Sequence, residues 1–76
     1  MSETPDSLEE IARIQAPYRR EIVLQDARFD SGMRLLRIRI REGTRFTIMD
    51  VDPATATALA SAIGDWASTA AQGTGP

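Results

Sequence analysis

The amino-acid sequence predicts an α+β fold in which a three-stranded antiparallel sheet is followed by a C-terminal helix. Apolar and polar residues alternate along residues 20–29 and 33–41, and a third such run spans residues 44–51. Alternation with a period of two is typical of half-buried strands. Asp52 and Pro53 then precede apolar residues at helical spacing. Together these patterns predict an antiparallel β-meander with one helix on its apolar face.

The first expected element is a short N-terminal helix that begins at Ser7 and ends before Pro17. Ser7 and Glu10 fit the capping box, in which each side chain accepts a hydrogen bond from a backbone amide at the start of a helix. The apolar positions that follow at helical spacing are Leu8, Ile11 and Ala12, with Ile14 or Gln15 beginning the next turn. A helix of under about a dozen residues is marginal without packing. Docked on the sheet, it would complete an αβββα arrangement.

Two glycine-containing turns are expected to join the three strands. Residues 30–32, Asp-Ser-Gly, suit a three-residue hairpin loop in which the glycine adopts the left-handed conformation. Residues 41–43, Arg-Glu-Gly, repeat this arrangement before the third strand. The first loop implies that Phe29 pairs with Met33.

The second loop implies that Ile40 pairs with Thr44, and this register assigns every side chain to a face. The face expected to form the core carries Ile22, Leu24, Leu36, Ile38, Ile40, Phe46 and Ile48. The other face is expected to be apolar toward the first turn and cationic toward the second.

The C-terminal helix has the clearest start signal in the chain. Asp52 is suited to the N-cap, because its carboxylate accepts hydrogen bonds from free amides, and Pro53 is suited to the first helical position. An apolar stripe follows, made of Ala56, Leu59, Ala60, Ile63, Trp66 and Ala67. Gly64 is unfavourable inside a helix, so fraying is expected beyond it.

Length and composition favour a single small domain over residues 7–69, between a flexible N-terminus, 1–6, and a flexible C-terminal tail, 70–76. The 76-residue chain contains no cysteine and no apolar run of the roughly 20 residues that cross a bilayer. We therefore expect a cytoplasmic protein without membrane contact. All nine basic residues are arginine and alanine is frequent, which indicates a GC-rich genome and a bacterial source.

The residues that usually carry catalysis are missing. The sequence has no histidine, cysteine or lysine, which removes the usual general base, thiolate nucleophile and Schiff-base amine. Asp50 and Asp52 form an Asp-x-Asp pair that could bind a divalent cation, but Asp52 is explained by the helix start and Asp50 is expected beside Arg34 on the core-facing side. We therefore predict no enzyme, no cofactor and no metal site.

Arginines offer one possible binding surface. Arg37, Arg39 and Arg45 are expected to project from the same sheet face, where guanidinium groups could contact phosphates. The formal net charge of −2 argues against nucleic acid as a general partner. Nucleic-acid binding is therefore the alternative hypothesis rather than the leading one.

The apolar end of that face is the leading candidate site. It contains Phe29, Met33, Leu35 and Met49, and one helix cannot cover both faces of a sheet. Either the N-terminal helix or a partner covers them, and the two are compatible. The sequence therefore predicts a non-catalytic module that binds another protein or a second copy of itself, in an accessory or regulatory role whose pathway it does not specify.

Overall fold

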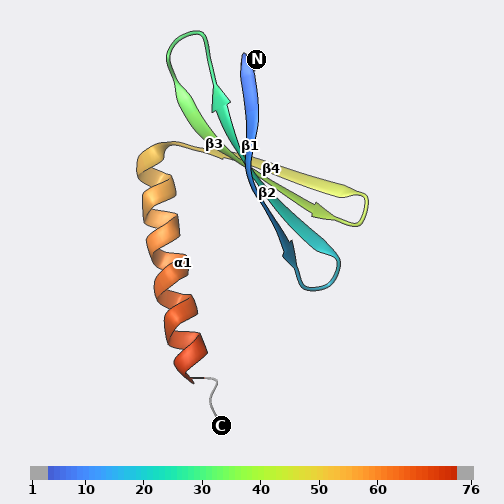
Figure 1. The fold of residues 1–76 in the computed structure, drawn as a ribbon, viewed down its shortest axis with the longest axis vertical. Helices are drawn as coiled ribbons and strands as arrows, with labels where there is room; N and C mark the ends of the chain where they lie inside the picture. Colours follow the sequence, from blue (N-terminus) through green and yellow to red (C-terminus); the bar gives the residue numbers. More distant parts are fainter. Residues whose placement is uncertain (1–3, 74–76) are drawn as a thin grey trace.

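A computed structural model describes residues 4–73 of the chain, with the side chains of residues 4–71. It contains four strands and one helix, in the order β1 (Ser7–Ala16), β2 (Arg20–Arg28), β3 (Arg34–Glu42), β4 (Arg45–Val51) and α1 (Pro53–Gly73). The strands form one antiparallel meander in sequence order (Figure 1). The α+β class with an antiparallel sheet and a C-terminal helix is thus confirmed, whereas the prediction of only three strands is wrong.

The expected N-terminal helix is wrong, because residues Ser7–Ala16 form the edge strand β1, paired with β2. A short helix gains little in isolation, whereas the strand satisfies its backbone along a partner. The pairing register shifts between Glu10 and Ala12, which leaves Ile11 as an extra residue in a β-bulge. This bulge interrupts the alternation of side chains, so the segment lacks the sequence pattern of a regular strand.

The turn between β1 and β2 is unusual in its backbone. Tyr18 has φ 65° and Arg19 has φ 61°, and neither residue is glycine. Left-handed backbone costs an L-residue about 1–2 kcal/mol. The hairpin therefore holds two consecutive residues in an unfavourable conformation.

The turn between β2 and β3 is the expected one. The Gly32 amide donates to the Phe29 carbonyl at 2.9 Å, the Phe29 amide donates to the Met33 carbonyl at 3.0 Å, and Gly32 has φ 92°. The predicted pairing of β2 with β3 is therefore confirmed. Asp6 also lies at this end of the sheet, where its amide donates to the Arg28 carbonyl at 2.8 Å and its carboxylate accepts from the amide of Asp30.

The predicted register of the last hairpin is wrong. Its loop has two residues, Gly43 and Thr44, and Gly43 has φ 65°, which fits a turn with glycine at the first central position. Ile40 pairs with Thr47 rather than with Thr44. This shift of three residues is odd, so every side chain of β4 lies on the face opposite to the expected one.

The observed register defines two faces of the sheet. The apolar face carries Ile14, Ile22, Leu24, Leu36, Ile38, Ile40 and Met49 in its middle. The opposite face, called the polar face below, carries Glu10, Arg13, Gln15, Glu21, Arg37, Arg39, Arg41 and Asp50, together with the apolar Val23, Ala27, Phe29, Leu35, Phe46 and Ile48. Phe46 and Ile48, expected on the core face, thus lie beside arginines.

Helix α1 begins as predicted. The Thr55 amide donates to the Asp52 carboxylate at 3.2 Å and the Ala56 amide donates to the Asp52 carbonyl at 2.9 Å. Hydrogen bonding by the Thr55 side chain and amide holds the pKa of Asp52 below its ordinary value. The expectation of fraying beyond Gly64 is wrong, because the helix continues to Gly73, over part of the expected tail. Residues 1–3 and 74–76 of the expected flexible ends lie outside the described residues.

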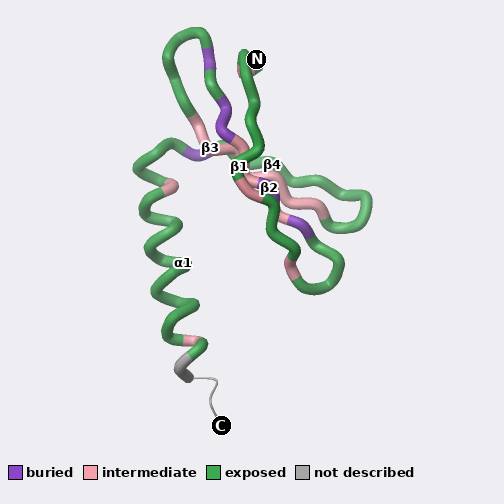
Figure 2. The backbone as a smooth tube through the Cα atoms, viewed as in Figure 1, coloured by how far each residue is buried: buried purple, intermediate pink, exposed green. Residues whose placement is uncertain are grey.

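The apolar core is small. Only Val23, Ala27, Phe29 and Val51 are buried apolar side chains among the described residues, and no large side chain there is fully buried. Helix α1 meets the sheet at β3 and then points away from it (Figure 1). It is exposed along almost its whole length (Figure 2). The predicted packing of the helix across the sheet is therefore realised only near its first turns.

Candidate interaction surface

An open apolar groove lies between α1 and the apolar face. Its volume is about 290 Å³, and the side chains around it come from β1, β2, β3 and the first half of the helix. The lining residues are Ile14, Ile22, Leu24, Leu36, Ile38, Ala56, Leu59, Ala60 and Ile63. The groove exists because alternation in the strands and helical spacing in α1 place both apolar stripes opposite each other.

The helix leaves the groove open toward solvent. Ile63 is 56% exposed and Trp66, one turn further on, is 71% exposed. Met49 and Ile14, on the two edge strands, are each about half exposed. Large apolar side chains gathered on one exposed surface usually mark a binding site.

Ion pairs lie at both ends of the apolar face. At one end the buried Asp26 carboxylate accepts hydrogen bonds from Arg28 at 2.9 Å and from Arg34 at 3.0 and 3.1 Å. These bonds, Arg34 first, hold the pKa of Asp26 below its ordinary value. At the other end Arg20 and Glu42 form an ion pair at 2.7 Å. An apolar centre with a polar rim is the usual anatomy of a protein interface.

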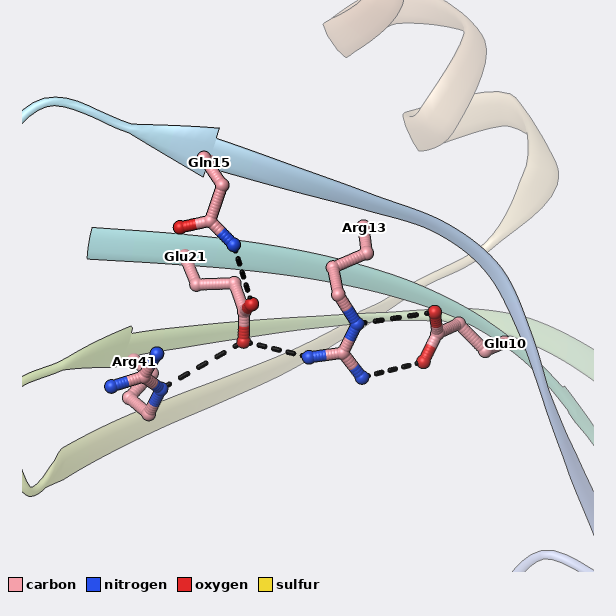
Figure 3. A network of polar contacts seen from close by, with 5 residues as sticks. All are labelled: Glu10, Arg13, Gln15, Glu21 and Arg41. Carbon is pink, nitrogen blue, oxygen red and sulfur yellow. Dashed lines mark hydrogen bonds and ion pairs between the residues drawn. The ribbon is translucent and has the colours of Figure 1, made fainter. Parts of the chain in front are cut away.

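The polar face is held together by a network around Glu21 (Figure 3). The Glu21 carboxylate, itself buried, accepts from Arg13 at 2.8 Å and from Gln15 at 2.7 Å, and Arg41 lies 3.7 Å away. Arg13 also donates to both oxygens of Glu10, at 2.7 and 3.2 Å. Arg13 and Gln15 hold the pKa of Glu21 below its ordinary value. Glu10, expected to cap a helix, instead pairs with Arg13 within β1, and Arg13 and Gln15 join this strand to Glu21 on β2.

The three candidate phosphate-binding arginines do not form one patch. Arg37 is engaged by Asp50, and the Arg39 guanidinium lies 4.4 Å from the centre of the Phe46 ring. Arg45 is opposite Glu42 on the other side of the sheet. Asp50 is therefore on the polar face beside Arg37, and its expected place beside Arg34 on the core-facing side is wrong.

The structure also separates the four candidate protein-binding residues. Met49 lies on the apolar face, while Phe29, Met33 and Leu35 belong to the opposite side. Phe29 is buried, Leu35 is half-buried and Met33 is 42% exposed. The single surface expected from the wrong register of β4 does not exist.

Sequence reasoning missed two features of this site. Ile14 lines the groove because β1 is a strand, which the bulge concealed. The ion pair of Asp26 with Arg34 could have been predicted from the alternation, because Asp26 continues the every-second-residue series of Ile22 and Leu24 and so lies on the same face. An acidic residue in the alternating positions of the apolar face, with two arginines near it, indicates an ion pair at the edge of that face.

Two features are absent from the described residues. No group of three or more potential ligands among histidine, cysteine, aspartate and glutamate lies together in the part of the chain that the structure describes. Within the same residues no helix combines the length and apolar character needed to cross a membrane.

Fold and surface together define a small α+β protein, a four-stranded meander with a C-terminal helix and an apolar face that this helix leaves open. The chain belongs to a family of unknown function, DUF6967, whose model matches residues 5–69. No curated protein and no solved structure matches it. The family assignment thus covers the whole sheet and most of the helix, and it assigns no role.

Proposed function

We propose that this protein is a non-catalytic protein-interaction module, accessory or regulatory in role, whose contact surface is the apolar groove between α1 and the sheet. The observation that carries the proposal is the groove itself, lined by apolar side chains and left half open. A protein partner would bury this surface, and burial yields roughly 25 cal/mol for each Å² of apolar area.

The composition supports the non-catalytic part of the proposal. The sequence offers no histidine, cysteine or lysine, and the described carboxylates with shifted pKa values are all lowered, so none is poised as a base near neutral pH. A cytoplasmic location fits this role and stays a prediction.

A pair of helix variants tests the proposal. Ile63→Asp places a charge in the groove, whereas Ser61→Asp places the same charge on the opposite side of α1. The affinity-tagged full chain is used to capture the bound partner, which is either an untagged copy of the chain or another protein. We expect wild type and Ser61→Asp to capture the same partner and Ile63→Asp to lose it. Equal retention by Ile63→Asp, with circular dichroism unchanged, would overturn the groove as the contact.

Nucleic-acid binding through Arg37, Arg39 and Arg45 stays an alternative, but no specific observation favours it. The engagement of Arg37 by Asp50 and the position of Arg45 weaken the case for a shared patch. Fluorescence anisotropy with a labelled oligonucleotide distinguishes the two, since phosphate-directed binding must weaken steeply as salt rises.

A further inference from the structure

The folded chain exposes more surface than a compact protein of its mass. Its accessible surface is 6023 Å², whereas a compact monomer of 8.3 kDa is expected to expose about 4,600 Å². The radius of gyration is 14.9 Å, against about 11 Å for a compact domain of this length. Each chain therefore has an excess of about 1,400 Å² of accessible surface.

Exposed apolar side chains contribute to this surface where the groove opens. Helix α1 has 21 residues and so extends for about 31 Å, but its main contact with the sheet is at β3. Beyond Ile63 its apolar stripe continues to Trp66, which is 71% exposed. The backbone of this half of α1 is coloured as exposed over nearly all of the described residues (Figure 2).

From this geometry we infer that a second copy of the chain occupies the groove, in a two-fold dimer in which the second half of each α1 packs on the apolar face of the other copy. The inference rests on the proposed function and names its partner. If two chains buried all of this excess between them, about 2,800 Å² would be removed, which is an upper limit that lies in the range of obligate homodimers.

Charge placement suits self-association. In this dimer the centre of each apolar face meets α1 of the other copy, so a charge there would be buried without a partner. Here the centre of the apolar face is uncharged, with Leu24 and Ile38 paired across β2 and β3. The charged residues, such as Asp26 and Glu42, are at the two ends and already carry their own arginine partners.

The small core favours a copy over an unrelated protein. With four buried apolar side chains in the described residues, the monomer lacks the packing that normally offsets the entropy of ordering a chain. A partner that completes the core must be present whenever the chain is made. A second copy is supplied by the same gene product, whereas an unrelated protein must be made separately.

Sedimentation equilibrium and thermal unfolding of the untagged full chain test the inference. We expect a mass of two 8.3 kDa chains at micromolar concentration and a thermal midpoint that rises with protein concentration. A single-chain mass together with a concentration-independent midpoint would overturn the dimer. In that case the comparison of Ile63→Asp with Ser61→Asp on the tagged chain still decides separately whether another protein uses the groove.

Variants and cross-linking test the geometry. Ile63→Asp is expected to raise the dimer dissociation constant by at least about 100-fold, while Ser61→Asp leaves it unchanged. Because Ile63→Asp could fail to fold, photo-cross-linking provides a second measurement. The chain carries p-benzoylphenylalanine in place of Trp66, and ¹⁴N and ¹⁵N chains are mixed in equal amounts so that cross-links between copies can be recognised. We expect cross-linked peptides of mixed isotope that join α1 to the apolar face. Cross-links confined to single-isotope pairs would contradict the proposed dimer.

Discussion

Arg37 and Asp50 face each other directly across β3 and β4, and they form a two-pronged ion pair. The Nε and Nη2 atoms of Arg37 donate to the two carboxylate oxygens of Asp50 at 2.8 and 3.0 Å. The pair holds the pKa of Asp50 below its ordinary value. It is possible only in the observed register, because a shift by an odd number of residues would place the two side chains on opposite faces.

A double-mutant cycle on Arg37→Gln and Asp50→Asn should therefore detect coupling. We expect an interaction energy of about 1 kcal/mol, above the usual value for a surface pair because both side chains are largely covered and the geometry is bidentate. Urea unfolding at a fixed protein concentration measures it. Strictly additive effects would contradict the pairing and, with it, the register of β4.

Substitutions in the turn between β1 and β2 should stabilise the protein. Replacing Tyr18 and Arg19 together by Asn and Gly supplies residues that tolerate positive φ, and we expect the free energy of unfolding to rise by about 1 kcal/mol. Tyr18→Ala is the matched control, since it removes the ring but keeps a non-glycine residue at φ 65°. A gain from the control equal to that of the double variant would mean that the ring, not the backbone, is unfavourable.

Two glycine-to-alanine substitutions should change the free energy of unfolding in opposite directions. Gly43 has φ 65° with open space around it, so Gly43→Ala introduces only backbone strain and is expected to lower the free energy of unfolding by about 1–2 kcal/mol. Gly64 is inside α1, also with open space, and Gly64→Ala should raise it by up to about 1 kcal/mol. Thermal melts at one concentration compare the two. A stabilising Gly43→Ala would contradict the two-residue turn.

Stability should depend on pH only in the acid range. The pKa values of Glu21, Asp26 and Asp50 are lowered by their arginine partners, so the stability that they contribute is complete above their unfolded pKa values and is lost as pH falls through the folded ones. We expect a constant thermal midpoint from pH 5.5 to 8 and a decline below about pH 4.5. Glu21→Gln, as a control, should show a shallower decline. A marked change between pH 6 and 8 would require a titrating side chain that this sequence, without histidine or cysteine, lacks.

Much of the sheet was predictable because its signals are local. The loop Asp30 to Gly32 and the alternation around it determine the pairing of β2 with β3, and Asp52 with Pro53 determines where α1 begins. The register of β4 was not predictable in the same way. Glycine at position 43 suits both a three-residue loop that ends with it and a two-residue loop that begins with it, and only the pairing with β3 distinguishes them.

Taken alone, the sequence determined the antiparallel strands β2 and β3, the capped helix, and a composition poor in catalytic side chains. Tertiary structure decided that residues 7–16 pair as a strand rather than coil as a helix, because the free edge of β2 offers hydrogen bonds that a short isolated helix does not match. It also decided that α1 leaves the apolar face half open, because the direction of a helix depends on packing and not on its own periodicity.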